Sequence, residues 1–394
     1  MSKDELILKI NEIIDFITNG EVEIQGYKFN GHPNFYLKHS QEEFNKELRS
    51  FIINKDRYNT SDVFYYLNHM FKYMLNEYDS HTQIYFMDKK MLPLKIRIID
   101  NKPYIVDCND SISHFRMKEI ININGVDISK IIYELENIIC YASDNYLKIM
   151  LEDYLRDVNI LKSIPSIENK DKMIIGTTDG DIIFDLNNLD IYKNKKRKEN
   201  YNLEIIGDIA VITYKSCSDE EKMKELIEQL ELLENVNSYI IDLRGNSGGN
   251  SSINRYLVNF LKDKKSITLC DERVFSSAMM CLMDLKNIGS KVIGTNPGTT
   301  INHFGNCILQ KQINNTNLKV YGSTKYFYYD NDMKCYGIIK EKFSNALEDF
   351  PNLLEPKFFN VDEIIEITLD DYKNENDPVL NYAINSLKEE RKER

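Results

Sequence analysis

The chain has 394 residues, of which 42% are hydrophobic and 28% charged, and its net charge is −12 at pH 7. This length predicts two or three domains, and the composition is that of a globular rather than a disordered protein. Nucleic acid is not expected as a partner, because no basic stripe is present to neutralise phosphates.

The N-terminal sequence and the spacing of the cysteines indicate where the protein is located and whether metal sites or disulfides are expected. The first ten residues contain acids where a secretory signal would be basic. No apolar run reaches about 18 residues, so we expect no membrane span and a cytoplasmic chain; export after removal of a leader is the alternative. The seven cysteines never form a CxxC pair, so neither a zinc site nor a disulfide framework is expected.

Residues 1–82 are predicted to form an N-terminal helical domain. Hydrophobic residues recur at helical spacing in residues 3–18, 44–51 and 60–75. Ser2 and Glu5 are placed as a capping box at the start of the first helix. An extended run begins shortly after the third helix.

Residues 83–192 are predicted to form a small α+β segment. A strand that starts at Lys118 leads through an Asn-Gly turn into a helix capped by Ser129. The amphipathic stretch Ser143–Leu161 predicts one further helix. Other strands are expected at 94–99, 104–107, 173–177 and 182–186.

The basic run Lys193–Lys198 is interpreted as a solvated loop at the start of the last domain, residues 193–394. Strands and helices alternate in this domain, which predicts a layered α/β structure. The strands are expected at 203–214, 238–243, 266–270 and 291–294, and the helices at 219–234, 251–262 and 276–288.

A glycine-rich turn carries the strongest chemical signal. An apolar strand ends at Asp242, and Gly248 and Gly249 follow before the next helix begins. Glycines carry no Cβ, so bare backbone N–H groups can point into a cleft beside a helix start. Such donors hold an oxyanion or a phosphate. The phosphate interpretation fails, because no Gly-Lys-Ser/Thr sequence follows.

Two serines open another apolar helix, and Ser276 lies 27 residues after Gly249. Ser276 or Ser277 is the candidate nucleophile, because a serine hydroxyl reacts once a base removes its proton and donors receive the oxyanion. The alternative interpretation is structural: Ser276 caps the helix and Ser277 is its first residue.

The base must come from one of six histidines. His81 lies where a helix meets a strand, a position from which a side chain can face a cleft. His303 is the rival candidate, because it is close to the serines in sequence. His69 lies inside a helix among aromatic residues and is interpreted as structural, and His32 lies in a loop with glycine and proline.

Three blocks in order, at 241–249, 274–278 and 291–295, resemble the tail-specific, or C-terminal-processing, serine protease family. Asp79-Ser80-His81-Thr82 is similar to the signature of its histidine-using branch, which includes the tricorn core and interphotoreceptor retinoid-binding modules. The stretch Lys118–Ile132 resembles the PDZ-like segment of the family. The resemblance implies a crotonase-like (ClpP-like) layered α/β catalytic domain, with the helical domain and the PDZ-like segment before it.

Carried over by motif, the resemblance implies Ser276 as nucleophile, although an ungapped count back from Gly294 favours Ser277. Gly249, with Gly248 beside it, and the Ser277 N–H would be the oxyanion donors. The stretch 295–310 contains no lysine, so His81 is the expected base and Ser80 a candidate for orienting it. The acidic third member stays open among Asp332, Glu341, Glu348 and Glu355. Met279 and Thr295 stand where the family has acidic residues.

These features together predict a serine peptidase that hydrolyses extended or C-terminal peptide segments through an acyl-serine intermediate. The expected partner is a peptide or protein substrate, with a homo-oligomer left open, and no metal or organic cofactor is implied. The alternative is a catalytically inactive binding module on the same fold, which the Met279 and Thr295 departures would permit. A thioester hydratase, by analogy of fold alone, is a third reading.

Overall fold

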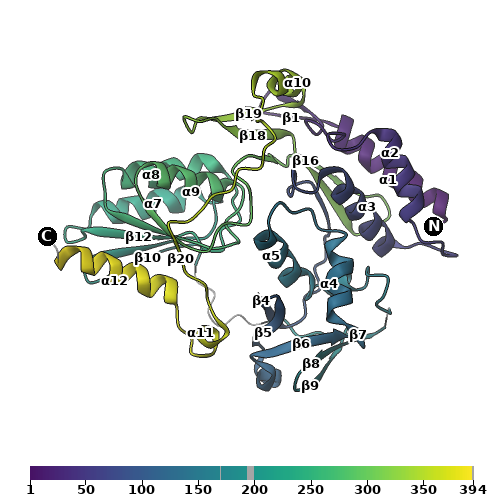
Figure 1. Ribbon diagram of the computed structural model, residues 1–394, viewed down its shortest axis with the longest axis horizontal. Helices are drawn as coiled ribbons and strands as arrows, with labels where there is room; N and C mark the ends of the chain where they lie inside the picture. Colours follow the sequence, from purple (N-terminus) through teal and green to yellow (C-terminus); the bar gives the residue numbers. More distant parts are fainter. Residues whose placement is uncertain (169, 193–198, 393–394) are drawn as a thin grey trace. The chain divides into compact units, whose positions relative to one another are not determined.

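The computed structural model describes residues 1–168, 170–192 and 199–392, so the basic run Lys193–Lys198 lies outside the described residues. The chain divides into two compact units (Figure 1). Unit 1 comprises Met1–Lys193 and Asn302–Lys357, and unit 2 comprises Asn194–Ile301 and Phe358–Arg394.

This division differs from the predicted domain ranges in two respects, the first being that residues 1–82 and 83–192 belong to one unit. Residues 302–357, which the sequence places in the last domain, cluster with unit 1. The reason is a non-local sheet in which β17 (Leu318–Gly322) pairs antiparallel with both β16 (Leu309–Gln312) and β3 (Gln83–Phe86). Residues 302–357, called the return segment below, therefore complete a sheet that residues 83–86 cannot form alone.

Three helices form the N-terminal part of unit 1, as the sequence predicts: α1 (Lys3–Asn19), α2 (Gln41–Phe51) and α3 (Thr60–Leu75). The predicted capping box of Ser2 and Glu5 is present at the start of α1. A hairpin of β1 (Glu21–Ile24) and β2 (Tyr27–Asn30), which the sequence analysis did not predict, connects α1 towards α2.

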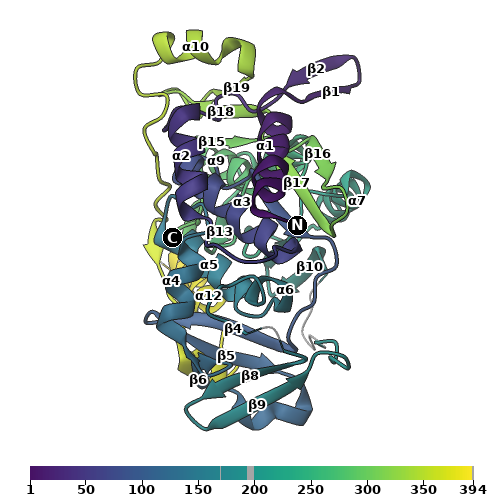
Figure 2. The same cartoon turned by 90° about the vertical axis from the view of Figure 1, so that its right-hand side faces the viewer.

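A second antiparallel sheet in unit 1 has the strand order β4-β5-β6-β8-β9, with β7 paired to β6 (Figure 2). The predicted cap of the helix after the Asn-Gly turn is wrong: Asp127 is the N-cap residue, and its carboxylate accepts the Ser129 N–H at 2.8 Å. The predicted single helix over Ser143–Leu161 is broken at residues 155–157. The elements are β4 (Leu94–Ile99), β5 (Lys102–Cys108), η1 (Asp110–Phe115), β6 (Lys118–Ile123), β7 (Val126–Asp127), α4 (Ile128–Glu136), α5 (Asp144–Tyr154), α6 (Val158–Leu161), β8 (Lys172–Thr177) and β9 (Gly180–Asp185).

The return segment adds a third sheet to unit 1. Strand β18 (Lys325–Tyr329) pairs with β15 (His303–Gly305) on one side and β19 (Cys335–Ile338) on the other, and α10 (Lys340–Asp349) follows. Phe304, Tyr326 and Phe343 are buried together in its core. This core fixes the start of β15, where His303 lies.

Unit 2 contains one sheet with the order β10-β11-β12-β13-β14-β20, parallel from β11 onwards. The predicted strand at 203–214 is two antiparallel strands, because Gly207 adopts a positive φ of 66° and turns the chain between them. The strands are β10 (Tyr201–Ile206), β11 (Ile209–Tyr214), β12 (Ser238–Asp242), β13 (Ser266–Cys270), β14 (Lys291–Gly294) and β20 (Glu363–Ile364).

Helices cover both faces of this sheet, with α12 (Pro378–Lys392) on the face opposite α7, α8 and α9 (Figure 1). Val379, Ala383 and Leu387 of α12 pack on buried strand residues such as Ile240 and Leu269. The predicted layered α/β structure is therefore confirmed. The remaining helices are α7 (Glu220–Glu231), η2 (Ser251–Ile253), α8 (Asn254–Leu261), α9 (Ser277–Asn287) and α11 (Leu369–Lys373).

Across the residues that the structure describes, no helix combines the length and apolar character that a membrane crossing requires.

A buried ion-pair network ties the end of β12 to α12. Arg244 donates to Asp242 through Nε at 2.9 Å and to both Asp377 oxygens at 2.8 Å, and Lys215 Nζ lies 2.6 Å from Asp242 Oδ1. Burial raises the pKa of Asp242, but Arg244 and Lys215 lower it more, to about 2. Asp377 also accepts the Leu380 N–H at 3.0 Å, in the first turn of α12. The Asp-Leu-Arg motif thus holds the sheet to its covering helix.

Replacing Arg244 by Met should lower the free energy of unfolding by about 3 kcal/mol, because it leaves the buried Asp242 with Lys215 alone and removes both hydrogen bonds to Asp377. Urea unfolding followed by circular dichroism measures this change. Lys224→Met is the control, since its ion pair with Glu220 is exposed and exposed pairs contribute little. Equal losses in the two variants would contradict a structural role for the Arg244 network.

Candidate functional site

The glycine-rich turn begins at the carboxyl end of β12 and contains three glycines with positive φ. Gly245, Gly248 and Gly249 have φ values of 79°, 96° and 137°. A Cβ on Gly248 would lie 2.8 Å from the Ser277 nitrogen and 2.9 Å from the Ser276 Cβ. A Cβ on Gly249 would lie 2.4 Å from the Cys217 oxygen. Gly248 and Gly249 therefore allow the turn to approach the start of α9 and the end of β11.

Two buried asparagines hold this approach in place. Asn246 Oδ1 accepts the Gly248 N–H at 2.9 Å, its amide donates to the Tyr214 carbonyl at 3.0 Å, and its own carbonyl accepts the Phe275 N–H at 3.1 Å. The Asn254 amide donates to the Ser277 carbonyl at 2.8 Å. Neither asparagine was expected at the site from sequence, although Asn246 lies inside the glycine-rich motif.

Ser276 has an unusual backbone conformation, with φ 55° and ψ −125°. Such angles cost a non-glycine residue on the order of 1–3 kcal/mol and concentrate at functional sites. Ser276 occupies the N-cap position of α9 but makes no capping hydrogen bond. Within the described chain its hydroxyl has no hydrogen-bond partner, so the helix-cap interpretation does not describe how this side chain is used.

Ser277, by contrast, is committed to the turn. It is buried as the first residue of α9, and its hydroxyl donates to the Gly249 carbonyl at 2.7 Å. The N–H groups of Ser277 and Gly249 donate to no other group among residues 1–168, 170–192 and 199–392. The Gly248 N–H is already bonded to Asn246. Two uncommitted donors, from Gly249 and Ser277, thus lie beside Ser276 at a helix N-terminus, where partial positive charge favours an anion.

In unit 1, His81 is held by a buried carboxylate that precedes it. Asp79 has no exposed surface. Its Oδ1 accepts the N–H groups of His81 at 2.7 Å and Thr82 at 3.0 Å, and its Oδ2 accepts the Thr82 hydroxyl at 2.5 Å. The same Oδ2 lies 3.0 Å from His32 Nε2. The backbone of the candidate base is therefore fixed by a charged group.

The two candidate bases lie together. The rings of His81 and His303 stack with centroids 5.2 Å apart and planes 13° apart. Burial lowers the pKa of His81 to about 3, the charge of His303 lowers it as well, and that of Asp79 raises it. His81 is therefore a neutral imidazole at physiological pH, the form that can accept a proton.

The other predicted residues lie in different surroundings. Ser80 offers its carbonyl to the Tyr146 hydroxyl at 3.3 Å. Of the four acids considered for the third position, Glu341 and Glu348 lie on α10, and Glu341 accepts a hydrogen bond from Asn30. The carboxylate that acts electrostatically on His81 is Asp79, which stands two residues before it in the motif and was not assigned this position from sequence.

The predicted site residues form two groups. Ser276, Ser277, Gly248 and Gly249 belong to unit 2, whereas His81 belongs to unit 1 with Asp79, His32 and His303. Each group is built by hydrogen bonds within its own unit.

Comparisons with known proteins place this geometry in context. Residues 208–280 match the family model of peptidase family S41. The structure resembles mature CPAF complexed with lactacystin, with a TM-score of 0.62 and 10% identity over 94% of this chain and 95% of that one, which shows a shared fold. The photosystem II D1 C-terminal processing protease matches with a TM-score of 0.45 and 9% identity, over 93% and 94% of the two chains. No curated protein sequence matches.

The lowered pKa of His81 predicts a loss of stability in mild acid. The unfolded chain binds a proton near pH 6.5 and the folded chain only near pH 3, so this stability is complete above pH 6.5 and falls as the pH drops towards 3. Between pH 7 and 5, wild-type protein should lose more unfolding free energy than His81→Gln, measured by urea titration.

His69, whose pKa is also lowered mainly by burial, adds to the loss in the same range. His69→Gln should therefore retain the part of the slope that His81→Gln removes. Identical slopes for wild-type protein and His81→Gln would show that His81 is not held neutral by the fold.

Proposed function

We propose that this chain is a serine peptidase, as the match of residues 208–280 to the model of peptidase family S41 supports. It hydrolyses peptide bonds in extended or C-terminal polypeptide segments. The observation that carries the proposal is the turn at Ser276, where an uncommitted hydroxyl on a strained backbone lies beside the Gly249 and Ser277 N–H donors.

In the proposed mechanism, the Ser276 oxygen attacks the carbonyl carbon of the scissile peptide bond. His81 takes the hydroxyl proton, and the carbonyl oxygen becomes an oxyanion that the Gly249 and Ser277 N–H groups receive. Collapse of this intermediate breaks the C–N bond, and His81 returns its proton to the leaving amine. Water, deprotonated by His81, then hydrolyses the acyl-Ser276 ester.

The N–H donors are suited to this task because they are fixed before substrate arrives. Asn246 and Asn254 are almost fully buried, and each binds backbone groups of the turn or of α9. Loss of one such donor typically costs 10²–10³-fold in rate.

A fluorophosphonate probe should modify Ser276 in the purified protein, since it reacts with serines activated by a base and an oxyanion hole. Intact mass and peptide mapping locate the adduct. Ser276→Ala and His81→Gln should abolish labelling, because nucleophile and base act as a unit.

Ser277→Ala is the matched control, since it keeps its N–H and loses only the tether to the Gly249 carbonyl. It should still be labelled on Ser276, at a reduced rate. An adduct on Ser277 in wild-type protein would contradict the assignment. A folded wild-type protein without adduct would favour the inactive binding module, which Met279 in place of the family's acid would permit.

Replacing Gly248 by Ala should lower the labelling rate by about 10²-fold or more, because the added methyl group displaces the start of α9 and with it an oxyanion donor. Gly245→Ala is the control in the same turn. Gly245 also has positive φ, but nothing lies within 4 Å of its would-be Cβ. It should cost about 1 kcal/mol of stability while keeping the labelling rate. Equal rates in the two variants would contradict the role given to the close approach.

A further inference from the structure

His32 is a fully buried histidine far from His81 in sequence. Its ring points at the Asp79 carboxylate, which also binds the His81 N–H. It lies in the loop between β2 and α2, with 1% of its surface exposed. Its ring stands against that of Phe304, with centroids 4.6 Å apart. Its Nε2 lies 3.0 Å from Asp79 Oδ2. The return segment and the N-terminal loop thus enclose the pair from two sides.

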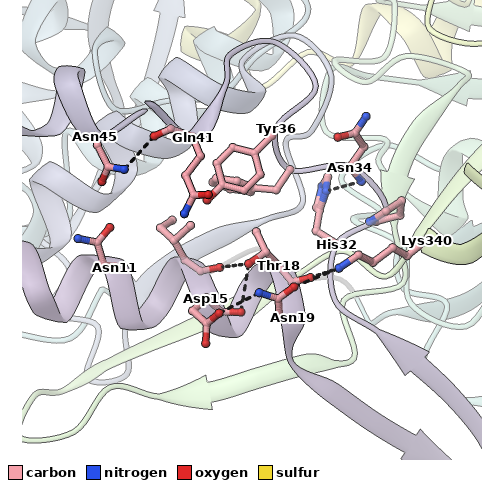
Figure 3. Close-up of a pocket in the computed structure, with 13 residues that line it drawn as sticks. Asn11, Asp15, Thr18, Asn19, His32, Asn34, Tyr36, Gln41, Asn45 and Lys340 are labelled. Atoms are coloured by element: carbon pink, nitrogen blue, oxygen red, sulfur yellow. Dashed lines mark hydrogen bonds between the residues drawn. The ribbon is translucent and has the colours of Figure 1, made fainter. Parts of the chain in front are cut away.

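The hydrogen bonds of His32 fix its tautomer. Nδ1 accepts the Asn34 N–H at 3.1 Å (Figure 3). A ring nitrogen that accepts a hydrogen bond carries no proton. The ring proton is therefore on Nε2, which donates to Asp79. His32 also lines a polar cavity of about 600 Å³, together with residues such as Asn11 and Lys340 (Figure 3).

Asp79 receives more donors than a turn requires. The His81 and Thr82 N–H groups alone would complete an Asp-initiated turn, and both use Oδ1. The donors on Oδ2 come from His32 and from the Thr82 hydroxyl, which itself accepts the Ser323 N–H at 3.1 Å. Although burial raises the pKa of Asp79, the hydrogen bonds of His32 and Thr82 and the neighbouring His81 lower it more. Asp79 therefore stays ionised.

We propose that His32 and Asp79 form a positioning pair for His81: His32 Nε2–H holds the Asp79 carboxylate, which fixes the His81 backbone and presents its negative charge to the imidazole. The pair rests on the proposed function of His81 as base. When His81 takes the Ser276 proton, the charge of Asp79 stabilises the imidazolium, while Asp79 stays ionised and His32 keeps its Nε2 proton. No proton passes along the pair.

Fluorophosphonate inactivation kinetics test the pair through kinact and KI. His32→Phe keeps the ring volume against Phe304 but removes the donor, so kinact should fall by about 10²-fold, the loss that a small misplacement of a catalytic group produces. KI should stay unchanged, because neither residue of the pair is proposed to contact the probe. His32→Gln, which can still donate to Asp79, should restore most of kinact.

Two further variants keep the test decisive. Asn11 lines the same cavity without bonding His32. Asn11→Ala should therefore behave like wild-type protein. If His32→Phe does not fold, Thr82→Val removes another Oδ2 donor and should lower kinact in the same direction. A folded His32→Phe or Thr82→Val with wild-type kinact, or a His32→Gln as slow as His32→Phe, would overturn the positioning role.

A second measurement separates this proposal from the proposed function. In ¹⁵N-histidine-labelled protein, NMR should show His32 as the Nε2-protonated neutral tautomer at pH 7, with its signal assigned from His32→Gln. An Nδ1-protonated or charged His32 would overturn the pair even if Ser276 is labelled. Conversely, wild-type protein without label at Ser276 would overturn the peptidase function, whatever the tautomer of His32.

Discussion

The proposed chemistry depends on one close approach, between the glycine turn after β12 and the first residues of α9. Only a residue without Cβ fits at Gly248, because the Ser276 Cβ and the Ser277 nitrogen would lie within 3 Å of any methyl group there. The approach places the Gly249 and Ser277 donors beside Ser276 and lets the Ser277 hydroxyl bind the Gly249 carbonyl. Buried amides and the Arg244 network then hold the turn on its sheet.

Residues at this close approach adopt backbone conformations and bury polar groups that local sequence preferences disfavour. The strands elsewhere in unit 2 follow those preferences. The strands β11 to β13 are buried along their whole length, and β14 is buried after its first residue, as expected for parallel strands covered on both faces. Ser276, in contrast, adopts a conformation that local sterics disfavour, and Asn246 and Asn254 place amides in a buried layer. Such a concentration of strain and buried polarity is expected where function overrides stability.

The sequence predicts most elements of unit 2, because periodicity and turn residues are local signals. It fails where the determinant is non-local. The pairing of β17 with β3 joins residues more than 230 positions apart, and no periodicity in 302–357 reveals that this stretch belongs with unit 1. The predicted helix cap at Ser129 is wrong for a more local reason: the carboxylate of Asp127, two residues earlier, is an equally good cap.

The residues of the candidate site likewise fall into those that the sequence predicts and those that it does not. Ser276 and the glycines come from motifs that are contiguous in sequence, so they could be named in advance. Asp79 stands beside His81 in the printed sequence, yet its importance rests on His32, which is 47 positions away and reaches it only after the N-terminal loop folds. The structure builds each group of predicted site residues within one unit: the Gly249 and Ser277 N–H donors in unit 2, and the neutral His81 in unit 1.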